Sequence, residues 1–189
     1  MSRLERFPRR VTLAALLAAL AASFVGAKVY LTQEEALRLA FPAGTSVERR
    51  TAFLTAAQQE AARKFCGSEK APSALITFYV GTTDGREVGT AYFDTHVVRT
   101  QPETILVLVD PHGAIARIEV LAFAEPEEYL PRANWYGQFS GRKLDEDLAV
   151  RRGIRPVSGA TLTARATLDA ARRVLAVHQV LHPVQAREP

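Results

Sequence analysis

The chain has 189 residues, of which 48% are hydrophobic and 23% are charged, and its formal net charge is +4. This length suits one domain with a proper core and an N-terminal appendage, but not two full domains. The first ten residues carry +3 of the net charge and leave +1 for the remainder, so the chain lacks the basic footprint of a nucleic-acid-binding protein. A single cysteine, Cys66, excludes an intramolecular disulfide, a cysteine-based metal cluster and a c-type haem site.

Residues 1–31 are predicted to be a membrane anchor or a signal peptide. Four arginines precede an uncharged run, Val11 to Ala27, that consists mostly of Ala and Leu. Its 17 residues are at the short end for a spanning helix, although Val29 to Leu31 extend the apolar stretch, and Val25-Gly26-Ala27 is a passable cleavage site. In either case, the positive charge before the run predicts that the rest of the chain lies on the extracytoplasmic (periplasmic) side of the membrane.

Residues 32–72 are predicted to be a helical connecting segment. Thr32-Gln-Glu-Glu35 has the residue order of a capping box, and the helix that it starts is expected to end at Pro42. A second helix is expected from about Val47 to Phe65, with Gly67 closing it and a linker following.

Residues 73–183 are predicted to form the main domain, which begins with extended segments. Asp84-Gly85 is a strong hairpin signal, and Asp110-Pro-His-Gly113 is a second turn of the same kind. The sequence therefore predicts four antiparallel strands around these turns. Their expected bounds are Leu75 to Val80, Arg86 to Phe93, Thr104 to Val109 and Ala114 to Phe123.

A long amphipathic helix is predicted near the C-terminus, after a short helix around Ala133 to Phe139. Ser158 is its expected N-cap, and Pro183 stops it. Its apolar stripe is formed by Ala166, Ala170, Val174, Val177 and Leu181. The predicted fold class is α+β: a twisted antiparallel sheet with helices packed on one side.

The histidines do not indicate a metal site. His96 stands at the junction of two extended segments, where a turn residue with satisfied hydrogen bonds is expected. His178 and His182 have the i,i+4 spacing that can grip a metal or haem. No acidic or third ligand stands near them in sequence, and histidines in the last turns of a helix favour its dipole.

The segment Ser158-Gly159-Ala160-Thr161-Leu162-Thr163, directly before the long helix, points to a specific chemistry. With Ser158 as the N-cap, Thr161 falls in the first turn, where free backbone N–H groups and the helix dipole favour an anion. Gly159 lets the backbone come close to a ligand. These residues predict a phosphate site, and the alternative is an ordinary Ser-capped helix after a glycine turn.

This hexapeptide resembles the flavin-attachment signature of the FMN-binding domain family, found in peripheral flavin subunits of Rnf and sodium-pumping NADH:quinone reductase complexes. The resemblance extends to Trp135-Tyr-Gly-Gln138-Phe139-Ser-Gly141-Arg142-Lys143, which is similar to the family's Trp, Gln-Phe and Gly-Lys stretch. Glu125-Pro126 stands where the family has a Glu-Thr-Pro-Gly loop near the flavin. The similarity covers residues 75 to 180, and the Ser-Gly-Ala-Thr core is its most specific part.

The resemblance implies that residues 73–183 are an FMN-binding domain and that a flavin transferase attaches FMN to the hydroxyl of Thr161 by a phosphodiester bond. Arg155 departs from the family pattern, which has an aspartate at this position, so covalent and non-covalent FMN both stay open. The other implied contacts to the phosphate and the ring are Ser158, Gly159, Ala160, Leu162, Thr163, Glu125, Tyr129, Trp135 and Lys143.

The function that the resemblance implies is electron transfer between redox partner proteins by a membrane-anchored, extracytoplasmic flavoprotein. It favours a retained anchor, because subunits of that family are held at the membrane by such a helix. The alternative is an exported module that binds a partner protein or a small ligand and has a degenerate flavin motif, for which Arg155 is the best support. A nucleophilic hydrolase is not indicated, because Ser158 lacks the Gly-x-Ser-x-Gly elbow.

Overall fold

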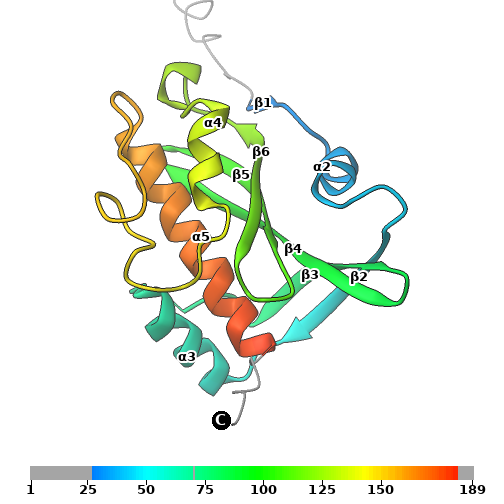
Figure 1. Cartoon of the computed structure of the whole chain (residues 1–189). Helices are drawn as coiled ribbons and strands as arrows, with labels where there is room; N and C mark the ends of the chain where they lie inside the picture. The colour runs from blue at the N-terminus through cyan, green and yellow to red at the C-terminus, as the bar shows by residue number, and fades with distance from the viewer. Residues whose placement is uncertain (1–26, 70, 183–189) are drawn as a thin grey trace, which may run out of the picture.

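The computed structural model describes residues 27–69 and 71–182, whose arrangement is shown in Figure 1. They form a six-stranded antiparallel sheet in the order β1-β6-β5-β4-β3-β2, packed with helices. The predicted α+β class is therefore confirmed. The elements in chain order are β1 (Lys28–Val29), α2 (Gln33–Ala40), β2 (Ser46–Phe53), α3 (Ala56–Cys66), β3 (Leu75–Thr83), β4 (Arg86–Val98), β5 (Gln101–Val109), β6 (Ile115–Phe123), η1 (Glu127–Tyr129), α4 (Ala133–Tyr136), η2 (Gly137–Phe139) and α5 (Thr161–Leu181).

Both predicted hairpins are present. The two residues between β3 and β4, Asp84 and Gly85, have φ angles of 51° and 74°. Positive φ at both central residues is the geometry for which Asp-Gly is favoured in a hairpin. In the β5–β6 turn, the Asp110 carboxylate accepts hydrogen bonds of 2.8 and 2.9 Å from the backbone N–H groups of His112 and Ala114.

The helix expected from Val47 to Phe65 is wrong in its first half. Ser46–Phe53 is strand β2, which pairs with β3 at the edge of the sheet. Its side chains are nearly all exposed, so it lacks the apolar alternation by which a half-buried strand is recognised. The helix α3 begins only after Thr55, which forms a capping box with Gln58, and it ends at Gly67 in the left-handed conformation, as predicted.

The chain joins the sheet as soon as its described part begins. Lys28 and Val29 pair with β6, and the Tyr30 N–H donates a 2.8 Å hydrogen bond to the Leu121 carbonyl. Val29 to Leu31 were expected to extend the apolar stretch, of which residues 11–26 lie outside the described residues. Over residues 27–69 and 71–182, no helix is long and apolar enough to cross a membrane.

Helices cover both faces of the sheet. The predicted capping box of Thr32 and Glu35 starts α2, which packs on the face opposite α5 through Ala36. The expectation that helices pack on one side only is therefore wrong. The cause is that β5 is apolar on both faces: Leu106 and Leu108 lie under α2 and need a cover of their own.

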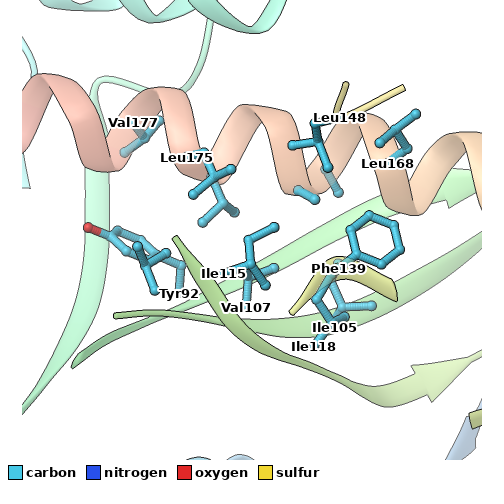
Figure 2. Packing of buried hydrophobic residues seen from close by; sticks show 14 of the residues in the cluster. Tyr92, Ile105, Val107, Ile115, Ile118, Phe139, Leu148, Leu168, Leu175 and Val177 are labelled. Atoms are coloured by element: carbon cyan, nitrogen blue, oxygen red, sulfur yellow. The ribbon is translucent and has the colours of Figure 1, made fainter. Parts of the chain in front are cut away.

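The larger core lies between the sheet and α5 (Figure 2). Ala170, Val174 and Val177 of the predicted stripe are buried there. The segment after the sheet also packs into this layer through Phe139 and Leu148, both fully buried. Because this packing holds α5 along its length, the first turn of the helix and the loops around it have a fixed position.

Candidate functional site

The Ser158–Thr163 segment forms a turn and the start of α5. The predicted N-cap is wrong: the N-cap position is held by Ala160, which makes no side-chain capping hydrogen bond. Gly159 has a φ of 82°, which is not helical, so the helix begins at Thr161, later than a Ser158 cap requires. The Thr161 hydroxyl donates a 3.2 Å hydrogen bond to the Val157 carbonyl.

A small pocket of about 230 Å³ opens at this turn, lined by Gly159 to Thr163 together with Tyr129 and Arg99. Thr161 and Leu162 are exposed, whereas Thr163 is buried and donates a 2.5 Å hydrogen bond to the Tyr129 carbonyl. Five of the predicted site residues of the hexapeptide therefore meet Tyr129 in one place.

Arg99 is a lining residue of this pocket that the sequence analysis missed. Its guanidinium carbon lies 4.3 Å from the centre of the Tyr129 ring, a cation–π contact. It occupies the β4–β5 turn with a φ of 54°, a conformation that few non-glycine residues adopt. No sequence signal marks an arginine for this conformation, and only the pairing of β4 with β5 brings it to α5.

A larger cavity of about 910 Å³ adjoins the same turn and shares the lining residue Ala160 with the small pocket. Ser158, Ala160 and Trp135 line it, together with the three basic residues Arg132, Arg142 and Arg155. Its volume is within the range of roughly 300–1,000 Å³ that is usual for cofactor pockets. One acidic residue, Glu128, also lines the cavity, so basic residues outnumber acidic ones there, and the buried Trp135 contributes only a small part of its indole surface. An excess of positive charge beside an aromatic side chain suits a flat anionic ligand.

Trp135 and Gln138 hold the chain that leads into the turn. The Trp135 indole N–H donates a 2.8 Å hydrogen bond to the Arg155 carbonyl, and the Gln138 side-chain oxygen accepts a 2.9 Å bond from the Arg155 N–H. Arg142 donates to the Gly153 carbonyl at 2.9 Å. A Cβ at Gly153 would meet the Asp147 carbonyl at 2.4 Å, so this close approach requires glycine.

Two predicted contacts lie apart from both cavities. Lys143 is exposed and lines neither of them. Glu125 instead holds the β4–β5 turn, because its carboxylate accepts hydrogen bonds from the Thr100 N–H and hydroxyl and from the Gln101 N–H. These bonds, that of the Thr100 backbone first, lower the pKa of Glu125 below its usual value.

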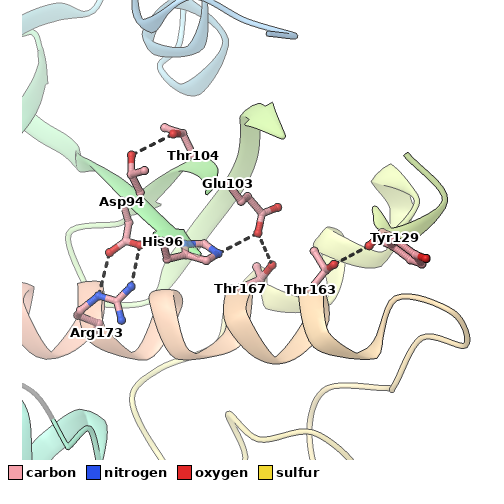
Figure 3. Close-up of polar contacts among 9 residues, drawn as sticks. Asp94, His96, Glu103, Thr104, Tyr129, Thr163, Thr167 and Arg173 are labelled. Atoms are coloured by element: carbon pink, nitrogen blue, oxygen red, sulfur yellow. Dashed lines mark hydrogen bonds and ion pairs between the residues drawn. The ribbon is translucent and has the colours of Figure 1, made fainter. Parts of the chain in front are cut away.

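A buried charge network lies between α5 and the sheet (Figure 3). The His96 ring nitrogens lie 3.0 Å from an Asp94 oxygen and 2.8 Å from a Glu103 oxygen. Arg173 donates two hydrogen bonds, of 2.9 and 2.7 Å, to Asp94. The prediction that His96 is a turn residue is wrong, because β4 continues to Val98 and carries His96 directly opposite Glu103.

The contacts of this network shift the pKa values of its members. Burial alone would lower the pKa of His96, but the hydrogen bonds that its ring donates to Asp94 and Glu103 outweigh this effect and raise the pKa to about 9. Burial would likewise raise the pKa of Asp94, but hydrogen bonds with His96 and Arg173 lower it to about 2. At neutral pH, His96 is therefore a cation and Asp94 an anion.

The two histidines at the end of α5 belong to the core. The His178 ring lies 3.0 Å from the Tyr92 hydroxyl and stacks on His182 with ring centres 4.7 Å apart. Burial, followed by the neighbouring His182, lowers the pKa of His178 to about 4. Within residues 27–69 and 71–182, no group of three His, Cys, Asp or Glu side chains is arranged so that it could hold a metal ion.

Comparisons with known proteins show a likeness in fold. The structure is similar to the crystal structure of NqrC from Shewanella oneidensis, with a TM-score of 0.52 over 72% of this chain and 84% of that chain. The two sequences are 16% identical over this match, so the likeness extends to the fold alone. No protein-family model matches the chain, and no curated protein matches it in sequence.

Proposed function

We propose that this protein is an electron-transfer flavoprotein that carries FMN at the start of α5. The observation that carries the proposal is that the motif and two pockets lie at the same place in the fold. The hexapeptide that resembles a flavin-attachment signature stands at the first turn of the long helix, contributes to the lining of two pockets, and belongs to a fold similar to that of NqrC. Sequence motif, fold and cavities are separate observations, and all three support the same cofactor.

The first turn of α5 fits the phosphate of FMN. Thr161 is exposed and lines the small pocket, although its hydroxyl donates to the Val157 carbonyl. The N-cap residue, Ala160, makes no side-chain capping bond, so the N–H groups of the first turn are open to a ligand. A Cβ added at Gly159 would meet nothing within 4 Å, so the space beside the turn is open. Arg99 adds a positive charge to the same pocket. Such a combination favours a phosphate ester at Thr161.

The larger cavity has the volume for the isoalloxazine ring, and it begins at Ala160, next to the proposed attachment residue. When bound, FMN supplies the electron-transfer chemistry, and the protein determines the position and potential of the ring. Trp135 offers a flat surface that excludes water, although most of its side chain is buried and held by Arg155. Arg132 and Arg155 favour negative charge in the cavity.

We further propose that the domain lies on the extracytoplasmic side, behind a membrane anchor formed by the apolar run from Val11 to Ala27, and serves redox partner proteins of a membrane electron-transfer chain. The apolar run after four arginines supports this orientation. A reporter fused after Pro189 is expected to be active only outside the cytoplasm, and cytoplasmic activity would contradict the orientation. Extraction with sodium carbonate separates a retained anchor, which stays with the membrane, from a cleaved signal.

The cofactor is tested by co-expression with a flavin transferase. The intact protein is expected to gain the mass of FMN minus water, and Thr161→Ala to remove this gain. The matched control is Thr163→Ser, which keeps the hydroxyl that donates to Tyr129 and is expected to stay modified. A colourless, unmodified wild-type protein would contradict the proposal and favour a binding module with a degenerate motif. A yellow protein without the mass gain would show non-covalent FMN, and Arg155→Asp then tests whether residue 155 prevents attachment.

A further inference from the structure

The buried network beneath α5 holds two cations against two carboxylates. Asp94 faces His96 and Arg173, and His96 also faces Glu103. The Glu103 side chain is fully buried, and those of His96 and Asp94 are 10% and 13% exposed. A net charge in such a place is costly, so the number of protons bound by the network responds to any charge added nearby.

His96 is the group of this network whose contacts depend on one proton. Each ring nitrogen lies within 3.0 Å of a carboxylate oxygen, Nδ1 at Asp94 and Nε2 at Glu103. Only the protonated imidazole donates two hydrogen bonds. The neutral ring turns one lone pair toward a carboxylate oxygen, which is repulsive. The surrounding titratable groups are Asp94 on β4, Glu103 on β5, Tyr136 on α4, and Asp169 and Arg173 on α5.

The network lies next to both proposed flavin pockets. Thr167 donates a 3.4 Å hydrogen bond to Glu103, and Thr163, one turn nearer the start of α5, forms part of the small pocket. On the other side, the Tyr136 hydroxyl and the Glu103 Oε1 atom are buried without a hydrogen-bond partner in the described part of the chain. Tyr136 packs against Trp135, which lines the larger cavity, with ring centres 5.1 Å apart. The network is therefore connected to the small pocket through α5 and to the larger cavity through Tyr136 and Trp135.

We propose that His96 is the proton-binding group of a buried network that is coupled to the charge of the flavin site. The inference rests on the proposed function. An electron delivered to the flavin by a redox partner or a chemical reductant adds negative charge to the site, and this charge stabilises protonated His96. At a pH near the pKa of His96, about 9, the neutral fraction of the ring then takes up protons from solvent, so a fraction of a positive charge accompanies each electron. At neutral pH, where His96 already carries its proton, its positive charge favours reduction without further proton uptake. The coupling is reciprocal: the protonated network raises the electron affinity of the site.

The test follows the proton affinity of His96 by NMR of the ring-labelled, flavin-loaded protein between pH 6 and 11, oxidised and then reduced with dithionite. A charge about 12 Å away at an effective dielectric constant of about 20 changes a proton affinity about tenfold. We therefore expect reduction to raise the proton affinity of His96 by about three- to tenfold. His112, exposed in the β5–β6 turn, is the internal control, and its ring signals are expected to be unaffected by reduction.

A second measurement uses the midpoint potential of the flavin. The flavin ring binds protons of its own on reduction, so the potential falls with rising pH in any case. In the wild type this fall is expected to be steeper where His96 loses its proton, and in His96→Gln the additional slope is expected to disappear while the flavin content stays the same. Flavin-loaded protein with equal His96 titration in both redox states would contradict the coupling and leave the proposed function intact. Absorbance of the same sample shows whether the protein carries flavin. Protein without flavin would contradict both the proposed function and the coupling.

Discussion

Gln138 and Arg155, 17 residues apart, are joined by a 2.9 Å hydrogen bond from the Arg155 backbone N–H to the Gln138 side-chain oxygen. With the bond from the Trp135 indole to the Arg155 carbonyl, both backbone polar groups of Arg155 are held. The Arg155 side chain takes no part in these bonds. The entry into the Ser158–Thr163 turn is therefore fixed by the Trp135 and Gln138 side chains, whatever residue stands at position 155.

Gln138→Leu is expected to lower the free energy of unfolding by about 1–2 kcal/mol, because the Arg155 N–H loses its acceptor. It is also expected to reduce flavin content, since the turn that presents Thr161 is no longer held. Gln138→Glu keeps an acceptor oxygen and is the matched control, with smaller effects on both. Urea denaturation and the ratio of flavin to protein absorbance measure the two quantities. Equal flavin content in all three proteins would show that the turn keeps its position without Gln138.

Ser158→Ala is expected to change the free energy of unfolding by less than about 0.5 kcal/mol. A true N-cap serine would cost about 1 kcal/mol on removal, but Ser158 makes no capping bond and its side chain is exposed. Thr55→Ala is the positive control, since Thr55 caps α3 in a capping box. Denaturant unfolding measures the free energy of unfolding of both variants. A larger loss in Ser158→Ala than in Thr55→Ala would contradict the observed start of α5.

Gly159→Ala is expected to lose flavin and about 1–2 kcal/mol of stability. The stability loss follows from the left-handed φ of 82°, which is strained for an L side chain, and not from a clash, because a Cβ here meets nothing within 4 Å. Gly113→Ala is the matched control, since Gly113 has a φ of 75° and equally open surroundings in the β5–β6 turn. Both variants are expected to lose similar stability by thermal denaturation, and only Gly159→Ala to lose flavin. Similar flavin content in the two would show that the ligand does not approach this turn.

The parts of the fold that the sequence predicted correctly have local signals. Asp84-Gly85 and the Thr32 to Glu35 capping box are each complete within four residues, and the structure contains both. The strands β1 and β2 depend instead on pairing with segments far along the chain. β1 has two residues, and β2 is a charged edge strand, so neither carries a periodic pattern of its own.

The sequence predicted the motif of the candidate site, but not all of the residues that surround it in the fold. Thr161 and Trp135 stand out in the sequence, whereas Arg99 reaches the pocket through the β4–β5 turn. The sequence also contained a signal for the buried network, but it was missed because the second strand was predicted to end at Phe93. Asp94 and His96 have the two-residue spacing of one strand face, and extending the hairpin to its turn at Arg99 places His96 opposite Glu103. Paired ionisable residues near a predicted turn are therefore a reason to test a longer hairpin.

The stability of the protein is expected to fall between about pH 6.5 and 9. The folded-state pKa of His96, about 9, lies above its ordinary value of 6.5, so the stabilisation by its proton is complete below 6.5 and is lost as the pH rises through 9. The difference corresponds to roughly 3 kcal/mol at most. His178, with its pKa lowered to about 4, affects stability only as the pH falls below 6.5, so the alkaline range isolates His96. Thermal denaturation from pH 6.5 to 10 is expected to show this loss of stability in the wild type and a flatter dependence of stability on pH in His96→Gln. His112→Gln is the control and is expected to keep the wild-type dependence. The same dependence in all three proteins would mean that the His96 proton does not stabilise the fold.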